Sequence, residues 1–298
     1  MSVGSGAGLR LRLGVLPLLA ASSLTAQTTS SPFHITTRPA RLVRGTLGVI
    51  TLRPSGPTVV ASLAGWAEGE PLHFTRTTKG RFTALIAAAV EGPDSLVVSL
   101  LPVGPSGERD SVDLRLAVAG GTYPRERLRV EAKYATPDSA AQQRISEEIA
   151  QALAIARQAH ETPRLWSHPF RAPRPGRVTS RFGTARILNG EVQSRHLGTD
   201  FAGAVGAPVR AANAGVVALV ADFYLAGTVV YLDHGEGVVT GYFHLSKALV
   251  AAGDTVTRGQ LIGRVGRSGR VTGPHLHWIA RYGTITVDPM SVLKLRER

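Results

Sequence analysis

The 298-residue chain contains no cysteine. This absence excludes a disulfide framework, a thiolate metal site, a cysteine nucleophile and a lipoprotein anchor, so any metal ion must be held by His, Asp or Glu. Aromatic residues make up only 6% of the chain, and no aromatic stripe accompanies the basic residues, which argues against nucleic acid as a partner. The hydrophobic content of 43% and charged content of 18% exclude a disordered or fibrous protein and allow one large domain or two ordinary ones.

Long hydrophobic runs are scarce, and the clearest one lies at the N-terminus. Arg10 and Arg12 precede an apolar run over residues 13–21, and small residues follow up to Ala26. This order is typical of a secretory signal peptide over residues 1–26. The run is shorter than the roughly 18 residues that a membrane span needs, and an uncleaved signal anchor is the alternative. The sequence therefore predicts an exported protein, periplasmic or extracellular, whose membrane contact is limited to such an anchor.

Acidic residues are outnumbered, with 21 Asp and Glu against 34 Lys and Arg and a formal net charge of +13. Most of the excess lies in residues 164–298, which hold 17 basic and 8 acidic side chains. This distribution predicts attraction of that part of the chain to an anionic polymer or surface. An Arg-biased composition that decorates the surface is the alternative, because only four of the basic residues are Lys.

Residues 32–135 consist of short apolar or alternating runs separated by turns rich in Pro, Gly and Ser. We expect strands over residues 47–52, 58–63, 72–77, 82–90, 95–101, 111–118 and 127–133. Seven strands at this spacing predict an antiparallel β-sandwich of the immunoglobulin-like type. Neither paired carboxylates nor a histidine cluster marks catalytic chemistry in this region.

A single amphipathic helix is predicted over residues 137–160, within a linker that spans 136–163. Ile145, Ile149, Leu153 and Ala156 recur at helical spacing, and Asp138 or Ser139 can cap the N-terminus. The apolar stripe must pack on a flanking domain or on a partner protein. From residue 164 to 298 the chain again shows strand patterns with glycine-rich turns, so we expect a second, antiparallel β domain.

Two segments of this second domain have the spacing of metal ligands. His275 and His277 are separated by one residue, and His196 and Asp200 by three, so each pair shares one face of an extended strand. Such nitrogen and oxygen ligands suit a tetrahedral zinc site with one position left for water. Each pattern alone occurs by chance in many proteins. His244, at the end of a predicted strand, adds a third element.

Three segments, taken in order, resemble the motifs of the lysostaphin and LytM type zinc endopeptidases, which cut peptidoglycan cross-links. They are RHLGTDF at 195–201, GYFHLS at 241–246 and GPHLHW at 273–278. GDTV at 253–256, GQLIG at 259–263 and VTSRFG at 178–183 are similar to the same family. The match covers roughly residues 170–290. It implies that residues 164–298 form a small antiparallel β domain of the duplicated hybrid motif type, in a mainly β protein.

The resemblance also implies the roles of five residues. His196, Asp200 and His277 correspond to the zinc ligands, whereas His275 and His244 correspond to the histidines that act on the metal-bound water and the transition state. Some relatives have lost ligands and serve as non-catalytic activators of amidases. Because this chain keeps all five positions, we expect a zinc metalloendopeptidase of the cell wall whose substrate is the peptide stems of peptidoglycan.

Two other functions remain open at this point. In the first, the domain binds peptidoglycan or an amidase without cutting, and the helix at 137–160 recruits the protein partner. In the second, residues 253–263 form the hairpin of a lipoyl- or biotinyl-type carrier, although the nearest lysine, Lys247, lies outside that turn. The N-terminal sandwich could target the enzyme, bind a protein or cover the active-site groove.

Overall fold

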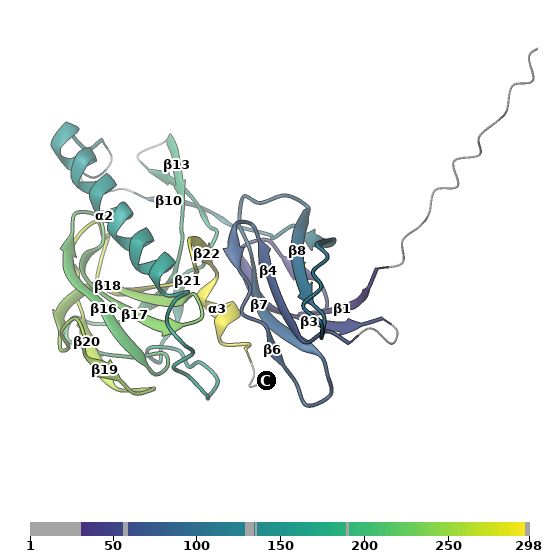
Figure 1. The fold of residues 1–298 in the computed structure, drawn as a ribbon. Helices are drawn as coiled ribbons and strands as arrows, with labels where there is room; N and C mark the ends of the chain where they lie inside the picture. Colours follow the sequence, from purple (N-terminus) through teal and green to yellow (C-terminus); the bar gives the residue numbers. More distant parts are fainter. Residues whose placement is uncertain (1–30, 56–58, 129–133, 135, 189–190, 296–298) are drawn as a thin grey trace, which may run out of the picture. The chain divides into compact units, whose positions relative to one another are not determined.

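The computed structural model (Figure 1) describes residues 31–55, 59–128, 134, 136–188 and 191–295. The predicted signal peptide lies outside these residues. Within them, no helix combines the length and the hydropathy required to cross a membrane. Most of the described secondary structure is β, with one long helix, and this agrees with the mainly β class predicted from the sequence.

The first part of the described chain forms two β-sheets. One has the order β1-β3-β7-β6 and the other the order β2-β9-β8-β4-β5. The first sheet contains β1 (Phe33–Arg38), β3 (Thr46–Pro54), β7 (Phe82–Ala88) and β6 (Thr75–Arg76). The second contains β2 (Leu42–Val43), β9 (Val112–Ala119), β8 (Ser95–Val103), β4 (Ser62–Ala67) and β5 (Glu70–Pro71).

The sequence of β7 is almost entirely apolar and does not alternate, and the position of this strand in the fold explains why. All seven of its residues are buried, because elements from the end of the chain, β22 (Ile285–Val287) and the short helix α3 (Pro289–Val292), contact this sheet. The Leu47 amide of the neighbouring β3 donates to the Ser291 hydroxyl at 3.0 Å. A strand that is covered on both faces needs apolar residues at every position.

Four of the expected N-terminal strands, over 47–52, 82–90, 95–101 and 111–118, are confirmed as β3, β7, β8 and β9. The expectation over 58–63 is wrong, because β4 begins at Ser62 and turns the small residues Gly65 and Ala67 inward. A Cβ on Gly65 would lie 2.8 Å from the Ser99 carbonyl oxygen. Glycine at this position therefore lets the backbone of β8 approach closely, and the usual run of bulky apolar residues is absent. Within 72–77 only Thr75–Arg76 is a strand, and β1 was not expected.

The last expected strand of this region, over 127–133, belongs to a different sheet. Strand β10 (Arg125–Leu128) pairs in parallel with β12 (Ala185–Leu188), which pairs with β13 (Glu191–Arg195). Residues 129–133 lie outside the described part of the chain. In this ladder Glu126 stands opposite Arg186. The sequence pattern correctly indicated extended structure at 127–128 but could not show that its partner lies about 60 residues further along the chain.

The predicted helix is confirmed as α2 (Ser139–Gln158). The Asp138 side chain caps it by accepting a hydrogen bond from the Ala141 amide at 2.8 Å. Ala152 and Ala159 pack in a cluster with Phe223, Tyr231 and Phe243 of the C-terminal sheet, and Figure 1 shows the helix running across that sheet. Ile149 remains 53% exposed, so the sheet covers only part of the apolar stripe.

The C-terminal sheet follows the path β11-β14-β21-β18-β17-β16-β19, with β15, β20 and β22 paired beside it. Every strand pair in it is antiparallel, as predicted. The strands are β11 (Val178–Ser180), β14 (Thr199–Ala202), β15 (Pro208–Arg210), β16 (Gly215–Phe223), β17 (Gly227–Gly235), β18 (Val238–Ala248), β19 (Thr255–Val256), β20 (Leu261–Val265) and β21 (His275–Tyr282). The sequence predicts strands here over residues 178–182, 209–211, 216–221, 228–233, 238–243, 260–265 and 275–280, so the short strands β12, β13, β14, β19 and β22 were not expected.

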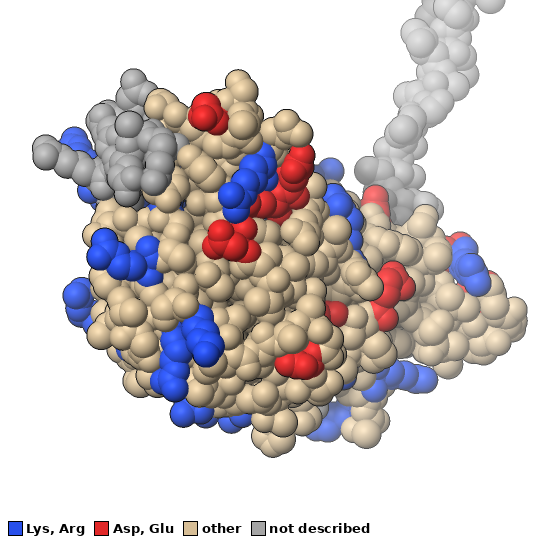
Figure 2. Space-filling view, turned by 90° about the vertical axis from the view of Figure 1, so that its left-hand side faces the viewer, with Lys and Arg blue, Asp and Glu red and all other residues tan. Residues whose placement is uncertain are grey.

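The Lys and Arg side chains visible on one face of the molecule form separate groups. On the face shown in Figure 2, blue Lys and Arg clusters are divided by uncharged surface, and one of them lies beside acidic side chains. No continuous basic surface is visible on this face. The view therefore agrees better with scattered arginines than with one extended track for an anionic polymer.

His234 lies in the segment DHGEG at 233–237, whose composition is typical of a turn, but the residue is buried at the end of β17. Its side chain is 0% exposed. Its Nδ1 lies 2.7 Å from the Ala214 carbonyl oxygen, and its Nε2 lies 2.8 Å from the Thr240 hydroxyl. Because the carbonyl can only accept, Nδ1 carries the proton and Nε2 accepts from Thr240. Burial lowers the pKa of His234 to about 4.

This depressed pKa predicts an acid-sensitive core. The unfolded chain binds a proton at this histidine near its ordinary pKa of about 6.5, whereas the folded chain does so only near pH 4. The contribution of neutral His234 is therefore complete above pH 6.5 and is lost as the pH falls toward 4, by at most about 3 kcal/mol. Urea unfolding with chelator present should show a smaller loss between pH 7 and pH 4.5 for His234→Gln than for the wild type. The exposed His168→Gln variant should keep the wild-type loss, and equal slopes for all three proteins would contradict the prediction.

Candidate metal centre

Strands β14, β21 and β18 lie side by side and bring the predicted site residues to one place. Asp200 on β14 is opposite His277 on β21, and Ala202 is opposite His275. His277 is also opposite Phe243 on β18, the residue before His244. His196 lies just ahead of β14, where the backbone hydrogen bonds of Gly183 and Thr184 hold its main chain. All five residues proposed from the sequence are thus within one small region.

Three of these side chains converge on a single point. The His196 Nε2 atom lies 3.0 Å from Asp200 Oδ1 and 2.9 Å from His277 Nδ1. The His277 Nδ1 atom lies 2.7 Å from the same Asp200 oxygen. Among the residues that the structure describes, this is the group of three His and Asp side chains whose ligand atoms are close enough to hold one metal ion. His196 and Asp200 are buried, and His277 is half-buried.

The hydrogen bonds around His196 show that this cluster suits a cation. The His196 Nδ1 atom lies 3.0 Å from the Arg181 carbonyl oxygen, which can only accept, so Nδ1 carries the proton. In the neutral ring, Nε2 then presents a lone pair to the Asp200 carboxylate and to the His277 nitrogen. Three lone-pair-bearing atoms at such distances repel one another unless a proton or a metal ion lies among them. The donor set therefore fits a divalent metal such as zinc.

The charge of Asp200 is held in place by its surroundings. Burial alone raises the pKa of this carboxyl, but its contacts with His196 and His277 lower the pKa by more, so the group stays ionised. An Arg186 guanidinium nitrogen lies 3.3 Å from the second oxygen, Oδ2. Arg186 thereby orients the carboxylate so that Oδ1 faces the two histidines.

His275 and His244 lie beside this group without joining it. The His275 Nε2 atom is 3.7 Å from Asp200 Oδ1, and its Nδ1 lies 2.8 Å from the Gly273 carbonyl oxygen. His244 Nδ1 lies 2.8 Å from the Ser268 carbonyl oxygen, and the centroids of the two imidazole rings are 4.9 Å apart. Both carbonyls can only accept, so both histidines carry their proton on Nδ1 and present an unprotonated Nε2.

The backbone of His244 is strained in a way that serves the side chain. Its φ of +59° lies in the left-handed region, which non-glycine residues adopt rarely. The His244 amide donates to the Ala226 carbonyl at 2.9 Å, and this bond fixes the conformation. Such strain often occurs where a side chain has to be aimed at a functional site.

Close packing fixes the His277 ring. The Phe243 ring stacks on it with centroids 5.3 Å apart. A Cβ added to Gly198 would lie 2.5 Å from His277 Cε1 and 2.6 Å from Nε2. A glycine at 198, in the middle of the His196 to Asp200 segment, is therefore required by the approach of a ligand ring. Burial lowers the pKa of His277 to about 4, which keeps the ring neutral and able to bind a metal at neutral pH.

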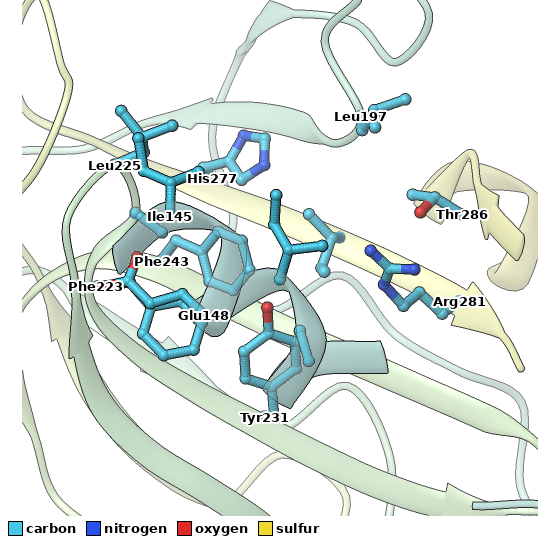
Figure 3. A pocket seen from close by; sticks show the side chains of 14 residues that line it. Ile145, Glu148, Leu197, Phe223, Leu225, Tyr231, Phe243, His277, Arg281 and Thr286 are labelled. Atoms are coloured by element: carbon cyan, nitrogen blue, oxygen red, sulfur yellow. The ribbon is translucent and has the colours of Figure 1, made fainter. Parts of the chain in front are cut away.

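An apolar groove adjoins the cluster on the side of helix α2. A cavity of about 270 Å³ lies between α2 and the sheet, and His277 forms part of its wall. Figure 3 shows His277 at one end, Phe223, Phe243 and Tyr231 along the sheet, and Leu197 and Arg281 at the margins. Leu197, which follows His196, is 42% exposed. A molecule bound at the cluster would thus meet an apolar wall.

Some residues around the cluster were not foreseen as parts of the site. Ser180 contacts His196, Arg186 contacts Asp200, and Glu126 contacts Ser180. Ser180 lies within the VTSRFG segment that resembled the endopeptidases, and this resemblance was the only signal available for it. Nothing in the sequence pattern marked Arg186 or Glu126, because their placement depends on the pairing of β10 with β12.

Comparison with known proteins gives a consistent result. The sequence profile of Peptidase family M23 matches residues 194–289, which include all five residues proposed from the sequence. The peptidoglycan DD-endopeptidase ShyA of Vibrio cholerae is 46% identical over 105 residues, which cover 34% of this chain and 24% of ShyA. The peptidoglycan DD-endopeptidase ShyC of the same organism is 40% identical over 118 residues, which cover 39% of this chain and 27% of ShyC. The chain thus spans about a quarter of the length of these curated relatives.

The likeness to a solved structure extends further along the chain. A crystal structure from Pseudomonas aeruginosa, described as a provisional peptidase M23, has a TM-score of 0.65 and 28% sequence identity. The match covers 85% of this chain and 95% of that one, so it includes regions outside the profile match. With the motifs, the converging ligand atoms and these similarities in place, residues 194–289 of the chain are assigned to Peptidase family M23.

Proposed function

We propose that the protein is a zinc metalloendopeptidase that hydrolyses peptide cross-links of peptidoglycan. The observation that carries this proposal is the convergence of His196, Asp200 and His277 at 2.7–3.0 Å, with two more histidines beside them. Two relatives named as peptidoglycan DD-endopeptidases support the choice of substrate. A substrate of this kind places the protein in the cell envelope, in agreement with the signal peptide predicted for residues 1–26.

The residues divide into those that hold the metal and those that handle protons. His196 Nε2, Asp200 Oδ1 and His277 Nδ1 would hold zinc, which when bound lowers the pKa of a water molecule to about 7 and polarises a carbonyl. His275 acts as general base, since its Nε2 is unprotonated and faces the metal-binding oxygen of Asp200. His244, whose Nδ1 lies on the Ser268 carbonyl oxygen and whose ring is beside that of His275, would donate a hydrogen bond from Nε2 to the developing oxyanion once that nitrogen has taken up a proton.

The remaining parts of the chain have proposed roles as well. We propose a division into a signal peptide (1–26), an immunoglobulin-like sandwich (32–135), a linker helix (136–163) and a peptidase domain (164–298). Two N-terminal sheets with a shared core support the sandwich. The apolar groove between α2 and the sheet adjoins His277, so helix α2 forms one wall of the path by which a peptide stem reaches the metal.

The test is the release of soluble fragments from purified peptidoglycan, followed by mass spectrometry. The zinc-loaded protein should release fragments cut within the peptide, and a zinc chelator should abolish the release because the ligands then lack the metal. Restoring zinc should restore the fragments. Binding of peptidoglycan without release, at one equivalent of zinc, would instead identify a non-catalytic binding module. Release that persists in chelator would contradict the metal-dependent mechanism.

A further inference from the structure

We infer that Glu126, which lies outside the region matched by the family profile, is a positioning residue of the metal centre and acts on the ligand His196 through Ser180. This inference rests on the proposed role of His196 as a metal ligand. It gives strand β10 a role in the metal centre, although none of the five residues proposed from the sequence lies on that strand.

A short chain of contacts connects the three residues. The Ser180 hydroxyl lies 2.7 Å from Glu126 Oε2 and 3.1 Å from His196 Nδ1. Ser180 is 9% exposed and His196 is 0% exposed, so water has little access to these bonds. A carboxylate from β10, a hydroxyl from β11 and the imidazole ring just ahead of β14 are thus connected by two consecutive contacts.

The direction of each hydrogen bond follows from the chemistry of the groups. His196 Nδ1 carries the proton because it also faces the Arg181 carbonyl oxygen at 3.0 Å. The Ser180 oxygen therefore accepts from this N–H, which it shares with the Arg181 carbonyl, and the hydroxyl proton of Ser180 is free to be donated to Glu126. A hydroxyl that donates to a carboxylate becomes a better acceptor, which strengthens its bond from His196. The bond fixes the ring and makes Nε2 a stronger ligand.

The charges nearby support the same arrangement. Glu126 and Arg186 are opposite each other in the parallel ladder of β10 and β12, and Arg186 contacts Asp200 Oδ2 at 3.3 Å. The Arg186 Nε atom is buried and, among the residues that the structure describes, has no hydrogen-bond partner. The guanidinium thus lies beside two carboxylates rather than in a fully bonded pocket. If Glu126 were removed, one carboxylate fewer would balance the positive charge of Arg186. That charge would then disfavour the binding of a cation at the ligands.

The experiment measures zinc affinity by competition with a chromophoric chelator, on the full protein. Glu126→Gln and Ser180→Ala should each weaken zinc binding about 10- to 100-fold, the usual effect of removing an outer partner of a ligating histidine. Relative to the wild type, the double variant should be weakened by less than the product of the two single effects, because Glu126 acts through Ser180. The control is Glu91→Gln, which removes the carboxylate that pairs with Arg195 beside His196 but contacts none of the ligands.

Two further measurements separate positioning from folding and from catalysis. The thermal midpoint of the metal-free Glu126→Gln variant should equal that of the wild type, and the absorption spectrum of its Co²⁺ form should be shifted. Unchanged zinc affinity, or effects of Glu126→Gln and Ser180→Ala that multiply, would overturn the inference. Zinc affinity is read without substrate, so a failure to cleave peptidoglycan would count against the proposed function alone.

Discussion

Replacing Asp200 with alanine should remove both the metal and the activity. The Asp200 Oδ1 atom contacts the ligand nitrogens of His196 and His277 and lies 3.7 Å from His275, and it provides the negative charge of the ligand set. Without it, two neutral imidazoles would face a cation alongside the positive charge of Arg186. Loss of Lewis-acid stabilisation is worth several kcal/mol, so kcat/KM on peptidoglycan should fall on the order of 10³-fold or more.

The measurement combines metal analysis with fragment release. Zinc content after dialysis should drop from one equivalent to background for Asp200→Ala and equally for His196→Ala. Asp113→Ala, at an exposed position of β9 in the N-terminal region, should retain both zinc and turnover. An Asp200→Ala protein that keeps a full equivalent of zinc would show that the metal lies elsewhere.

Replacing His275 with alanine should give the opposite combination, with zinc retained and turnover lost. Its Nε2 atom is outside the cluster of three ligand atoms, so the metal keeps its protein ligands. The variant lacks the proposed general base, and general-base loss typically lowers the rate by about 10²- to 10⁴-fold. The loss should appear mainly in kcat, because the proton moves only in the chemical step.

A matched substitution distinguishes this role from simple disruption of the strand. His34→Ala replaces an exposed histidine of β1 and should leave kcat unchanged. Loss of zinc from His275→Ala would make His275 a ligand and contradict its role as base. Unchanged kcat would transfer the base function to His244, whose Nε2 is unprotonated by the same hydrogen-bond argument.

The sequence could predict the inner part of the site because its residues occur in short contiguous motifs. Two histidines one residue apart on a strand must share a face, so the proximity of His275 and His277 follows from local geometry alone. Their meeting with His196 and Asp200 depends on the pairing of β14 with β21. Only the resemblance to a family supplied that information, since the four-residue β14 has no strand pattern that stands out from its flanks.

The outer part of the site could not be predicted, and the reason is the same as for the misplaced strands. Glu126 and Arg186 lie opposite each other because β10 pairs with β12, in register, across about 60 residues of chain. Pairing partners are chosen by tertiary packing, which a linear pattern does not encode. The position of β4 was predicted wrongly because small residues, Gly65 and Ala67, face inward in it, and such residues give no apolar strand pattern. The burial of His234 was missed because its segment, DHGEG, has the composition of a turn, although the ring is hydrogen-bonded at both nitrogens.

Because β10 pairs in parallel with β12, residues 194–289 cannot be treated as a self-contained module. The family profile begins at residue 194, whereas Glu126, Ser180 and Arg186 all precede it. A chimera joined at the profile boundary would carry the three ligands without Glu126, Ser180 and Arg186, and one joined within helix α2 would carry them without Glu126. Junctions placed before residue 125 would keep the ligands and the residues that contact them in one segment, which is longer than the stretch that the family profile matches.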